Sequence, residues 1–261
     1  MSLNFNQFKD KASEILNINL SGYKLKRVKR RTDSLMRRHD VKDYEKCLDL
    51  LKNDNEFKAA YLSHFTINTS EFYRNPKNFS YLKENILPEL LESNNKLNIW
   101  SAPCSNGSEP YTIAIILTEM GINKSRYNIL ASDLDTEVLK IAREGKYSSN
   151  SLKNVPDNII SKYFEKTTDK DEYQLKREII NQIKFEKKDL INDSFQKNWD
   201  LILSRNFFIY LTREIKDKLT DKFVSALKPG GYFFLGNTEF IFNPDRYGLK
   251  KEHLSFYRKK E

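Results

Sequence analysis

The chain has 261 residues, of which 31% are charged and 39% are hydrophobic. No apolar run approaches the roughly 18 residues that a membrane-spanning helix needs, and the first ten residues lack the apolar stretch of a signal peptide. Cys47 and Cys104 form neither a disulfide framework nor a metal-ligand spacing, and His39, His64 and His253 are too scattered for a metal site. We therefore expect a soluble, cytoplasmic protein without a metal, with room for one large core or two smaller ones.

The first 65 residues show helical periodicity throughout. Apolar side chains repeat at helical spacing over three segments, approximately 5–16, 44–51 and 57–65, and we expect Asp40 to cap the second of them. Short helices of this kind pack as a small bundle. We predict an all-helical N-terminal domain with its linker over residues 1–75.

A strongly basic helix, residues 24–38, lies between the first two of these segments. It carries eight Lys or Arg and one Asp, a net charge of +7, so the rest of the chain contributes only +2 to the total of +9. Its apolar positions fall near one face with Thr32 between them: Leu25, Val28, Leu35 and Met36. A solvated charged face is one interpretation. The charge nevertheless exceeds what solubility requires, which favours an acidic partner, either nucleic acid or a Glu-rich protein surface.

From residue 76 onward the pattern changes to alternating strands and helices. Asn75 is a candidate cap and Pro76 suits the first turn of a helix. Predicted strands at 97–102, 127–135, 199–206, 231–239 and 253–259 are separated by predicted helices near 110–120, 136–143 and 213–227. This alternation is typical of an α/β domain with a parallel sheet covered on both faces. The last two strands have no helix between them, which predicts a hairpin at one edge of a domain spanning 76–261.

The segment 160–187 interrupts the alternation. It contains short alternating runs, YQLKREI and QIKFEK, instead of a clean helical pattern. We predict a small antiparallel sheet inserted into the α/β domain, and an ordinary helix with a loop is the alternative.

The loop at 104–109 indicates what the α/β domain binds, because the first strand-to-helix turn of a doubly wound fold faces the cofactor. The loop has one glycine, Gly107, where a dinucleotide fingerprint has three, and it ends in Glu109, whose carboxylate would repel a phosphate. Asp133 ends the next strand, near the offset at which an acid meets ribose hydroxyls, with Asp135 on the opposite pleat. This favours S-adenosylmethionine, which is cationic and has no phosphate. Helix capping by the two acids is the plainer alternative.

Five blocks of the chain resemble, in order, the chemotaxis receptor methyltransferases of the CheR family. They are NTSEFYRNPKNF, IWSAPCSNGSEPYTIAI, ASDLDTEVLKIAREGKY, LSRNFFIYL and GYFFLGNTE. The resemblance implies an all-helical domain followed by a Rossmann-like α/β methyltransferase domain with a small antiparallel β-subdomain inserted in it. It also implies methyl transfer from S-adenosylmethionine to glutamate side chains of methyl-accepting chemotaxis receptors, which yields glutamyl methyl esters and S-adenosylhomocysteine.

The resemblance further implies functional residues. Cofactor contacts fall at Asn68, Ser70, Arg74, Glu109, Asp133, Asp189, Leu190, Arg205 and Asn206. Arg74 and Tyr210 would lie nearest the transferred methyl group. The chain departs from the usual family residues at Ser70, Tyr73, Ser108, Asp189 and Ser204. Asp189 matters most among these, because a carboxylate cannot donate the hydrogen bond that the more common Asn can.

The chemistry agrees with these residue types. A glutamate with an ordinary pKa of about 4.3 is ionised near neutral pH and needs no general base. The enzyme must supply orientation, to which Arg74 and Tyr210 would contribute hydrogen bonds to a carboxylate.

The basic helix would then dock acidic receptor helices. We expect Arg27, Arg30, Arg31, Arg37 and Arg38 to form this surface. A nucleic-acid methyltransferase and a non-catalytic binding module are the alternatives, but the chain has no N-P-P-Y-type motif and keeps the polar residues of the family site. We expect a monomer that binds neither nucleic acid nor a membrane directly.

Overall fold

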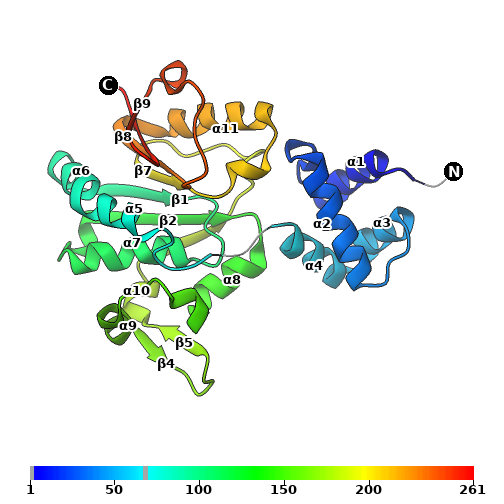
Figure 1. Ribbon diagram of the computed structural model, residues 1–261, viewed down its shortest axis with the longest axis horizontal. Coiled ribbons are helices and arrows are strands. Elements are labelled where there is room, and N and C mark those ends of the chain that lie inside the picture. Colours follow the sequence, from blue (N-terminus) through cyan, green and yellow to red (C-terminus); the bar gives the residue numbers. More distant parts are fainter. Residues whose placement is uncertain (1–2, 67–69) are drawn as a thin grey trace.

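The N-terminal domain is built from helices α1 (Phe5–Leu16), α2 (Leu25–Arg38), α3 (Tyr44–Asn53) and α4 (Asn55–Phe65). The computed structural model describes residues 3–66 and 70–261, and in Figure 1 this domain lies beside the larger α/β domain. Its helices enclose one apolar core that includes Phe8, Ala12, Val28, Leu35, Cys47, Leu51, Phe57 and Tyr61. The structure thus confirms a helix at each of the four segments that helical periodicity predicted.

Side-chain caps explain where the helices of this domain begin. Asn4 forms a capping box at α1, and Asp54 accepts hydrogen bonds from two backbone N–H groups at the start of α4. The prediction that Asp40 caps α3 is wrong, because Asp43 holds that position and accepts from the backbone of Lys46. Asp40 instead has a left-handed backbone, with φ of 52°, in the turn after α2.

Helix α2 buries most of its predicted apolar face. Val28, Leu35 and Met36 lie in the core of the domain, and the Thr32 hydroxyl lies 2.7 Å from the Tyr61 hydroxyl. Leu25 departs from the prediction and is 48% exposed. It occupies the first turn, beyond the core.

A helical rod of three parts opens the α/β domain. The parts are α5 (Pro76–Tyr81), the π-helical turn η2 (Leu82–Ile86) and α6 (Leu87–Ser93). Pro88 at the start of α6 has no N–H to donate to the preceding turn, which accounts for the irregular hydrogen bonding there. Asn75 occupies the cap position of α5, as predicted, but its side chain makes no capping hydrogen bond.

A seven-stranded sheet forms the centre of this domain. Its strands are β1 (Leu97–Ser101), β2 (Tyr127–Asp133), β6 (Ile183–Lys187), β7 (Trp199–Ser204), β8 (Leu227–Leu235), β9 (Leu249–His253) and β10 (Phe256–Lys259). The order is β6-β2-β1-β7-β8-β10-β9. The first five are parallel, and β10 runs antiparallel to β8, with Phe256 opposite Phe234. A hairpin does form at one edge, as predicted, but its strands are β9 and β10, and β10 also pairs antiparallel with β8.

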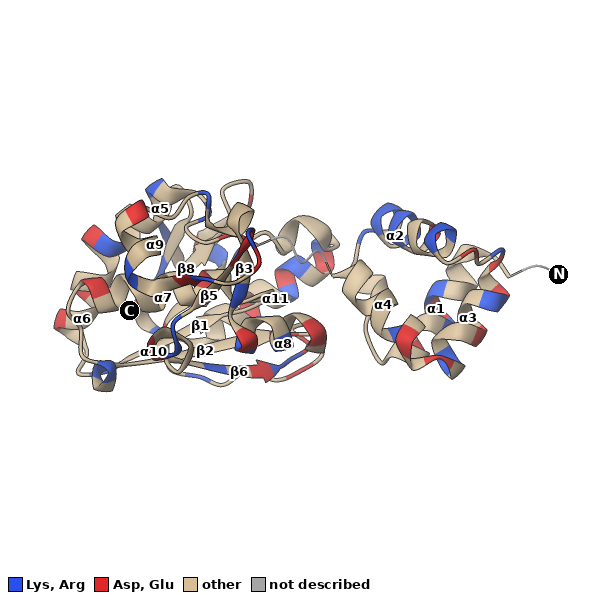
Figure 2. Ribbon diagram, turned by 90° about the horizontal axis from the view of Figure 1, so that it is seen from below, with Lys and Arg blue, Asp and Glu red and all other residues tan. Residues whose placement is uncertain are grey.

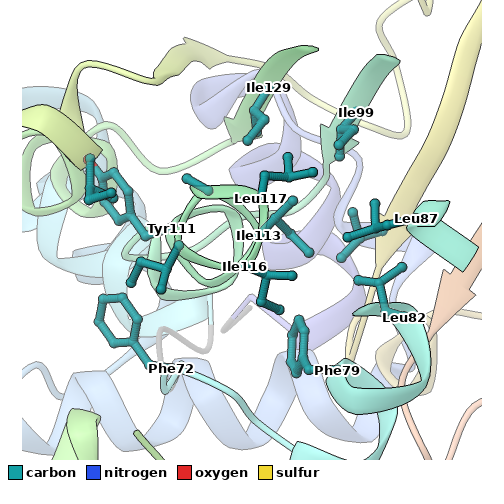
Figure 3. Packing of buried hydrophobic residues seen from close by; sticks show 14 of the residues in the cluster. Phe72, Phe79, Leu82, Leu87, Ile99, Tyr111, Ile113, Ile116, Leu117 and Ile129 are labelled. Atoms are coloured by element: carbon teal, nitrogen blue, oxygen red, sulfur yellow. The ribbon is translucent and has the colours of Figure 1, made fainter. Parts of the chain in front are cut away.

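Helices cover both faces of the sheet, so its strands are apolar on both sides. They are α7 (Ser108–Glu119), α8 (Thr136–Glu144) and α11 (Arg213–Ala226). Ile99 and Ile129 pack with α7 and the α5–α6 rod, as Figure 3 shows. Trp100 and Leu130 on the opposite pleat pack in a second cluster with α11.

The small antiparallel sheet exists, but its extent differs from the predicted 160–187. It consists of β3 (Lys146–Ser148), β4 (Phe164–Lys166) and β5 (Glu172–Leu175) in the order β3-β5-β4, with α9 (Asp157–Tyr163) and α10 (Arg177–Ile180) beside it. The run QIKFEK instead supplies β6, which pairs in parallel with β2 at the edge of the main sheet. Alternation identifies a strand without saying which sheet it joins.

Short 3₁₀ turns connect several elements. They are η1 (Leu20–Gly22), η3 (Lys124–Arg126), η4 (Ser149–Leu152), η5 (Phe208–Tyr210) and η6 (Pro244–Tyr247). Within the described part of the chain, no helix has the length and apolar character needed to cross a membrane.

Backbone hydrogen bonds join the two domains where η1 and α2 meet η5. The Lys24 N–H donates to the Tyr210 carbonyl at 3.0 Å, and the Thr212 N–H donates to the Gly22 carbonyl at 2.9 Å. Tyr23 and Leu211 form an isolated β-bridge between these two bonds. The start of α2 is therefore fixed against the α/β domain by main-chain contacts.

Gly145 lies between α8 and β3 and packs against Ile180 of α10. Both Gly145 and Gly121 have φ of 70°, but an added Cβ would lie 2.5 Å from Ile180 Cδ1 at Gly145 and would meet nothing within 4 Å at Gly121. Gly121→Ala should cost about 1 kcal/mol for its left-handed backbone. Gly145→Ala should cost about 2 to 3 kcal/mol because overpacking is added. Urea unfolding measures both, and equal losses would contradict the packing described here.

Candidate functional site

One cavity lies at the carboxyl ends of β1, β2, β6 and β7, where the helical domain meets the α/β domain. Of the residues that the resemblance implies, it is lined by Ser70, Arg74, Glu109, Asp133, Asp189, Leu190, Arg205, Asn206 and Tyr210. Asn68 lies outside the described residues. Residues from distant segments are thus brought together around one space.

The sheet topology explains the position of this cavity. β1 lies between β2 and β7: the chain passes from β1 to β2 and then to β6 on one side of β1, and it crosses from β6 to β7 on the other side. In open α/β sheets such a reversal of strand order leaves a crevice beyond the carboxyl ends, where ligands bind.

Glu109 and Arg205 form a buried ion pair in the cavity wall. Arg205 Nη1 lies 3.2 Å from Glu109 Oε2, and the Ser101 hydroxyl donates to Glu109 Oε1 at 2.8 Å. The two side chains are 2% and 10% exposed. Burial lowers the pKa of Arg205, and the Glu109 carboxylate opposes that effect. Glu109 therefore binds side chains and not the N–H groups of its own helix, so it is not a helix cap.

Arg205 also holds the linker between the domains. Its Nη2 donates to the Arg74 carbonyl at 2.6 Å and to Asn75 Oδ1 at 2.9 Å. Its guanidinium carbon lies 4.6 Å from the centroid of the Phe234 ring. Arg205 thus fixes the backbone that carries Arg74.

Asp133 lies at the end of β2 and receives two backbone donors. The Ser105 N–H donates at 2.8 Å and the Asp135 N–H at 3.1 Å. Burial raises the pKa of Asp133 to about 6, against the lowering effect of these hydrogen bonds. The prediction that Asp135 lies on the opposite pleat of the strand is wrong, because Asp135 is the N-cap of α8. It also accepts a hydrogen bond from the Thr66 hydroxyl at 3.0 Å.

Asp189 and Leu190 form the wall that follows β6. The Asp189 carboxylate accepts from the Ile191 N–H at 2.9 Å and from Asn192 Nδ2 at 2.8 Å. The carboxylate thus organises its own turn. Leu190 is 5% exposed and provides an apolar surface.

Unusual backbone conformations gather around the cavity. Tyr73, Asn75, Ser105 and Asn206 have positive φ values of 52°, 63°, 50° and 60°. For residues other than glycine such values cost free energy and often occur at functional sites. The Ser105 hydroxyl is buried and has no partner among the described residues, so it is available to a ligand.

The charges of the wall are more balanced than the sequence indicates. The acidic lining residues Glu71, Glu109, Asp133 and Asp189 stand with the basic residues Arg27, Arg74, Lys188 and Arg205. A ligand with both signs of charge suits this wall better than a purely cationic one. S-adenosylmethionine fits, because it carries an ammonium, a sulfonium and a carboxylate.

The predicted docking arginines separate into two groups. Arg30, Arg37 and Arg38 are exposed on α2 and Arg31 is half-buried, and Figure 2 shows the basic positions along this helix. Arg27 does not belong to the exposed surface, because it is only 8% exposed and lines the cavity. Helical periodicity placed it on the charged face, and contact with the second domain buries it.

Glu239 supports the site and was not identified from the sequence. It accepts from the Asn206 N–H at 2.6 Å and the Gly236 N–H at 2.9 Å, and burial raises its pKa. A Cβ at Gly236 would lie 2.6 Å from Glu239 Oε2. The sequence signal that could have identified it is the acid Glu239 three residues after Gly236, at the end of the block GYFFLGNTE. Tyr23 and Phe65 also line the cavity, and no sequence pattern identified them as site residues.

Both domains of the chain are similar to known proteins. Residues 3–66 match the family described as CheR methyltransferase, all-alpha domain, and residues 68–254 match CheR methyltransferase, SAM binding domain. A chemotaxis protein methyltransferase of Listeria innocua is 37% identical over 94% of this chain and 92% of its own length. A chemotaxis protein methyltransferase of Borreliella burgdorferi is 34% identical over 92% of this chain and 91% of its own length. One of Escherichia coli is 30% identical over 84% and 78%.

The Arg205–Glu109 pair should respond to mutation as a coupled unit. Arg205→Met leaves the Glu109 carboxylate buried without its counter-ion and should cost about 3 kcal/mol of unfolding free energy. Adding Glu109→Gln should recover part of that loss, so the two single changes should not sum in the double variant. Urea unfolding of the four proteins measures the coupling. Additivity within about 0.5 kcal/mol would show that the pair does not act as a unit.

Proposed function

Because the chain belongs to the CheR family of methyltransferases, we propose that it methylates glutamate side chains of methyl-accepting chemotaxis receptors, forming glutamyl methyl esters. S-adenosylmethionine is its cofactor, and methyl transfer in chemotaxis is its class of reaction. The observation that best supports the glutamate substrate is the junction cavity, where Arg74 and Tyr210 lie in the same wall as the buried acids.

Different residues of the cavity would bind different parts of the cofactor. S-adenosylmethionine, when bound, supplies an electrophilic methyl group. Asp133 would accept hydrogen bonds from its ribose, and Glu109 would attract its ammonium. Leu190 offers a buried apolar contact.

Arg74 and Tyr210 would orient the glutamate. A carboxylate is ionised near neutral pH, so the site needs donors that position it and no base that deprotonates it. The backbone of both residues is held by partners: Arg205 binds the Arg74 carbonyl, and the Lys24 N–H binds the Tyr210 carbonyl. Tight binding of the carboxylate in the ground state would slow transfer, so the main contribution is alignment.

The exposed arginines of α2 would guide the receptor to this cavity. Arg30, Arg37 and Arg38 present positive charge on the helix whose start is joined to η5, beside Tyr210. Acidic receptor helices would be attracted by this surface and aligned with the cavity. We place this reaction in the cytoplasm, where buried free thiols such as Cys47 and Cys104 stay reduced.

A methyl-transfer assay tests the proposed function. The full chain is incubated with radiolabelled S-adenosylmethionine and, in parallel, with a receptor cytoplasmic fragment or RNA. We expect label on the receptor fragment alone, released by mild base as esters are. Base-stable label, or label on RNA, would contradict the proposal.

If the exposed arginines of α2 dock the receptor, their removal should weaken methylation of the receptor and leave the affinity for the cofactor unchanged. Reversal of Arg30, Arg37 and Arg38 to Glu should lower kcat/KM for the receptor fragment by about tenfold or more, because steering and docking lose opposite charge. The affinity for S-adenosylhomocysteine should stay within about twofold. Reversal of the exposed Lys11, Lys52 and Lys140 gives the same net charge and is the control. Equal losses in both triple variants would reject a localised docking surface.

Asp133 predicts a pH-dependent affinity for the cofactor. Its pKa near 6 means that the carboxylate is ionised at pH 7 and mostly protonated at pH 5. If the ionised form accepts the ribose hydrogen bonds, affinity for S-adenosylhomocysteine should weaken about tenfold from pH 7 to pH 5. Calorimetry measures this, and Asp133→Asn should flatten the profile. A flat profile in the unmodified protein would contradict the role given to Asp133.

A further inference from the structure

Arg27 brings a positive charge from the helical domain into the cavity of the α/β domain. It lies in the first turns of α2, is 8% exposed, and lines the cavity together with Tyr210. Its guanidinium carbon lies 3.3 Å from the centroid of the Tyr210 ring. Stacking on this ring fixes the plane of the guanidinium at the junction of the two domains.

Two nitrogens of the Arg27 guanidinium have no hydrogen-bond partner among the described residues, although the group also interacts with the Tyr210 side chain. Nη2 donates to the Phe65 carbonyl at 3.3 Å, while Nε and Nη1 are buried and have no partner among the described residues. A buried guanidinium normally has its donors satisfied, because unpaired N–H groups shielded from water are costly. The arrangement therefore leaves two buried donors that no described residue satisfies.

No acid of the cavity wall serves as the counter-ion of Arg27 in the described structure. Glu109 pairs with Arg205, and Asp133 accepts from the backbone of Ser105 and Asp135. The other two are also engaged: Asp189 binds Asn192 and the Ile191 N–H, and Glu71 pairs with Lys153. Arg27 is thus without an acidic partner among the described residues of the wall.

We propose that Arg27 binds the carboxylate of the receptor glutamate beside Tyr210 and so selects an ionised side chain over a neutral one. This inference rests on the proposed function and deepens it. Arg27 stands over the ring of the residue proposed to orient the glutamate, on the same helix as the exposed docking arginines. One helix thus attracts an acidic receptor by its outer face and receives the reacting group by its inner one. Arg27 is a specificity residue contributed by the helical domain.

The test compares two matched receptor fragments, one with Glu at a single methylation position and one with Gln there. Binding of each is measured by calorimetry with S-adenosylhomocysteine present, so that no methyl transfer occurs. The unmodified protein should bind the Glu fragment about tenfold more tightly than the Gln fragment, as expected for a charge-assisted hydrogen bond. Arg27→Gln should abolish this preference while its affinity for S-adenosylhomocysteine changes less than twofold. Lys11→Gln removes an exposed charge from the same domain and should retain the full preference.

Two results would overturn the inference. One is no preference in the unmodified protein. The other is a preference retained in Arg27→Gln, which together with a tenfold loss of S-adenosylhomocysteine affinity would assign Arg27 to the cofactor carboxylate. If Arg27→Gln does not fold, Arg27→Lys keeps the charge without the planar group and should show a reduced preference, whereas a full preference would overturn the inference. Failure of the unmodified protein to form base-labile esters on the Glu fragment would instead contradict the proposed function.

Discussion

The ion pair between Arg205 and Glu109 is the interaction on which the site depends. It joins the residue after β7 to the first turn of α7, across the crevice where the strand order reverses. Arg205 extends the connection to the Arg74 carbonyl and Asn75, so the linker between the domains is held by the same guanidinium. Two charges this deeply buried are tolerated because each compensates the other. The pair therefore organises three segments that no local pattern brings together.

The helical domain completes the cavity in addition to carrying the proposed docking surface. Main-chain hydrogen bonds between Lys24 and Tyr210 and between Gly22 and Thr212 fix the start of α2 against the loop that follows β7. This contact gives α2 an exposed basic surface and an inner residue, Arg27, facing the cavity. Receptor binding and alignment of the reacting side chain would then be coupled through one rigid helix.

Much of the fold could be predicted from periodicity, and the parts that could not share a physical reason. Helical spacing identified the N-terminal helices, and alternation of strands and helices identified the parallel sheet. Residues 183–187 alternate as an inserted strand would, but pairing with β2 is decided by distant contacts. The prediction that Arg27 is exposed was wrong for the same reason, because Arg27 is buried by a contact with Tyr210 in the other domain. Within the site, Glu109 and Asp133 were found because a strand end and a helix start are visible locally, whereas the Arg205 partnership is not.

A crystal structure of the full chain with S-adenosylhomocysteine tests the central claim most directly. We predict that the ligand lies at the carboxyl ends of β1, β2 and β6, with its ribose at Asp133, its ammonium facing Glu109, and Arg27 still stacked on Tyr210 with its free donors pointing to the open side. A ligand bound elsewhere, or acids turned away from it, would contradict the account. Density for the ligand carboxylate on Arg27 would contradict the role given to the helical domain.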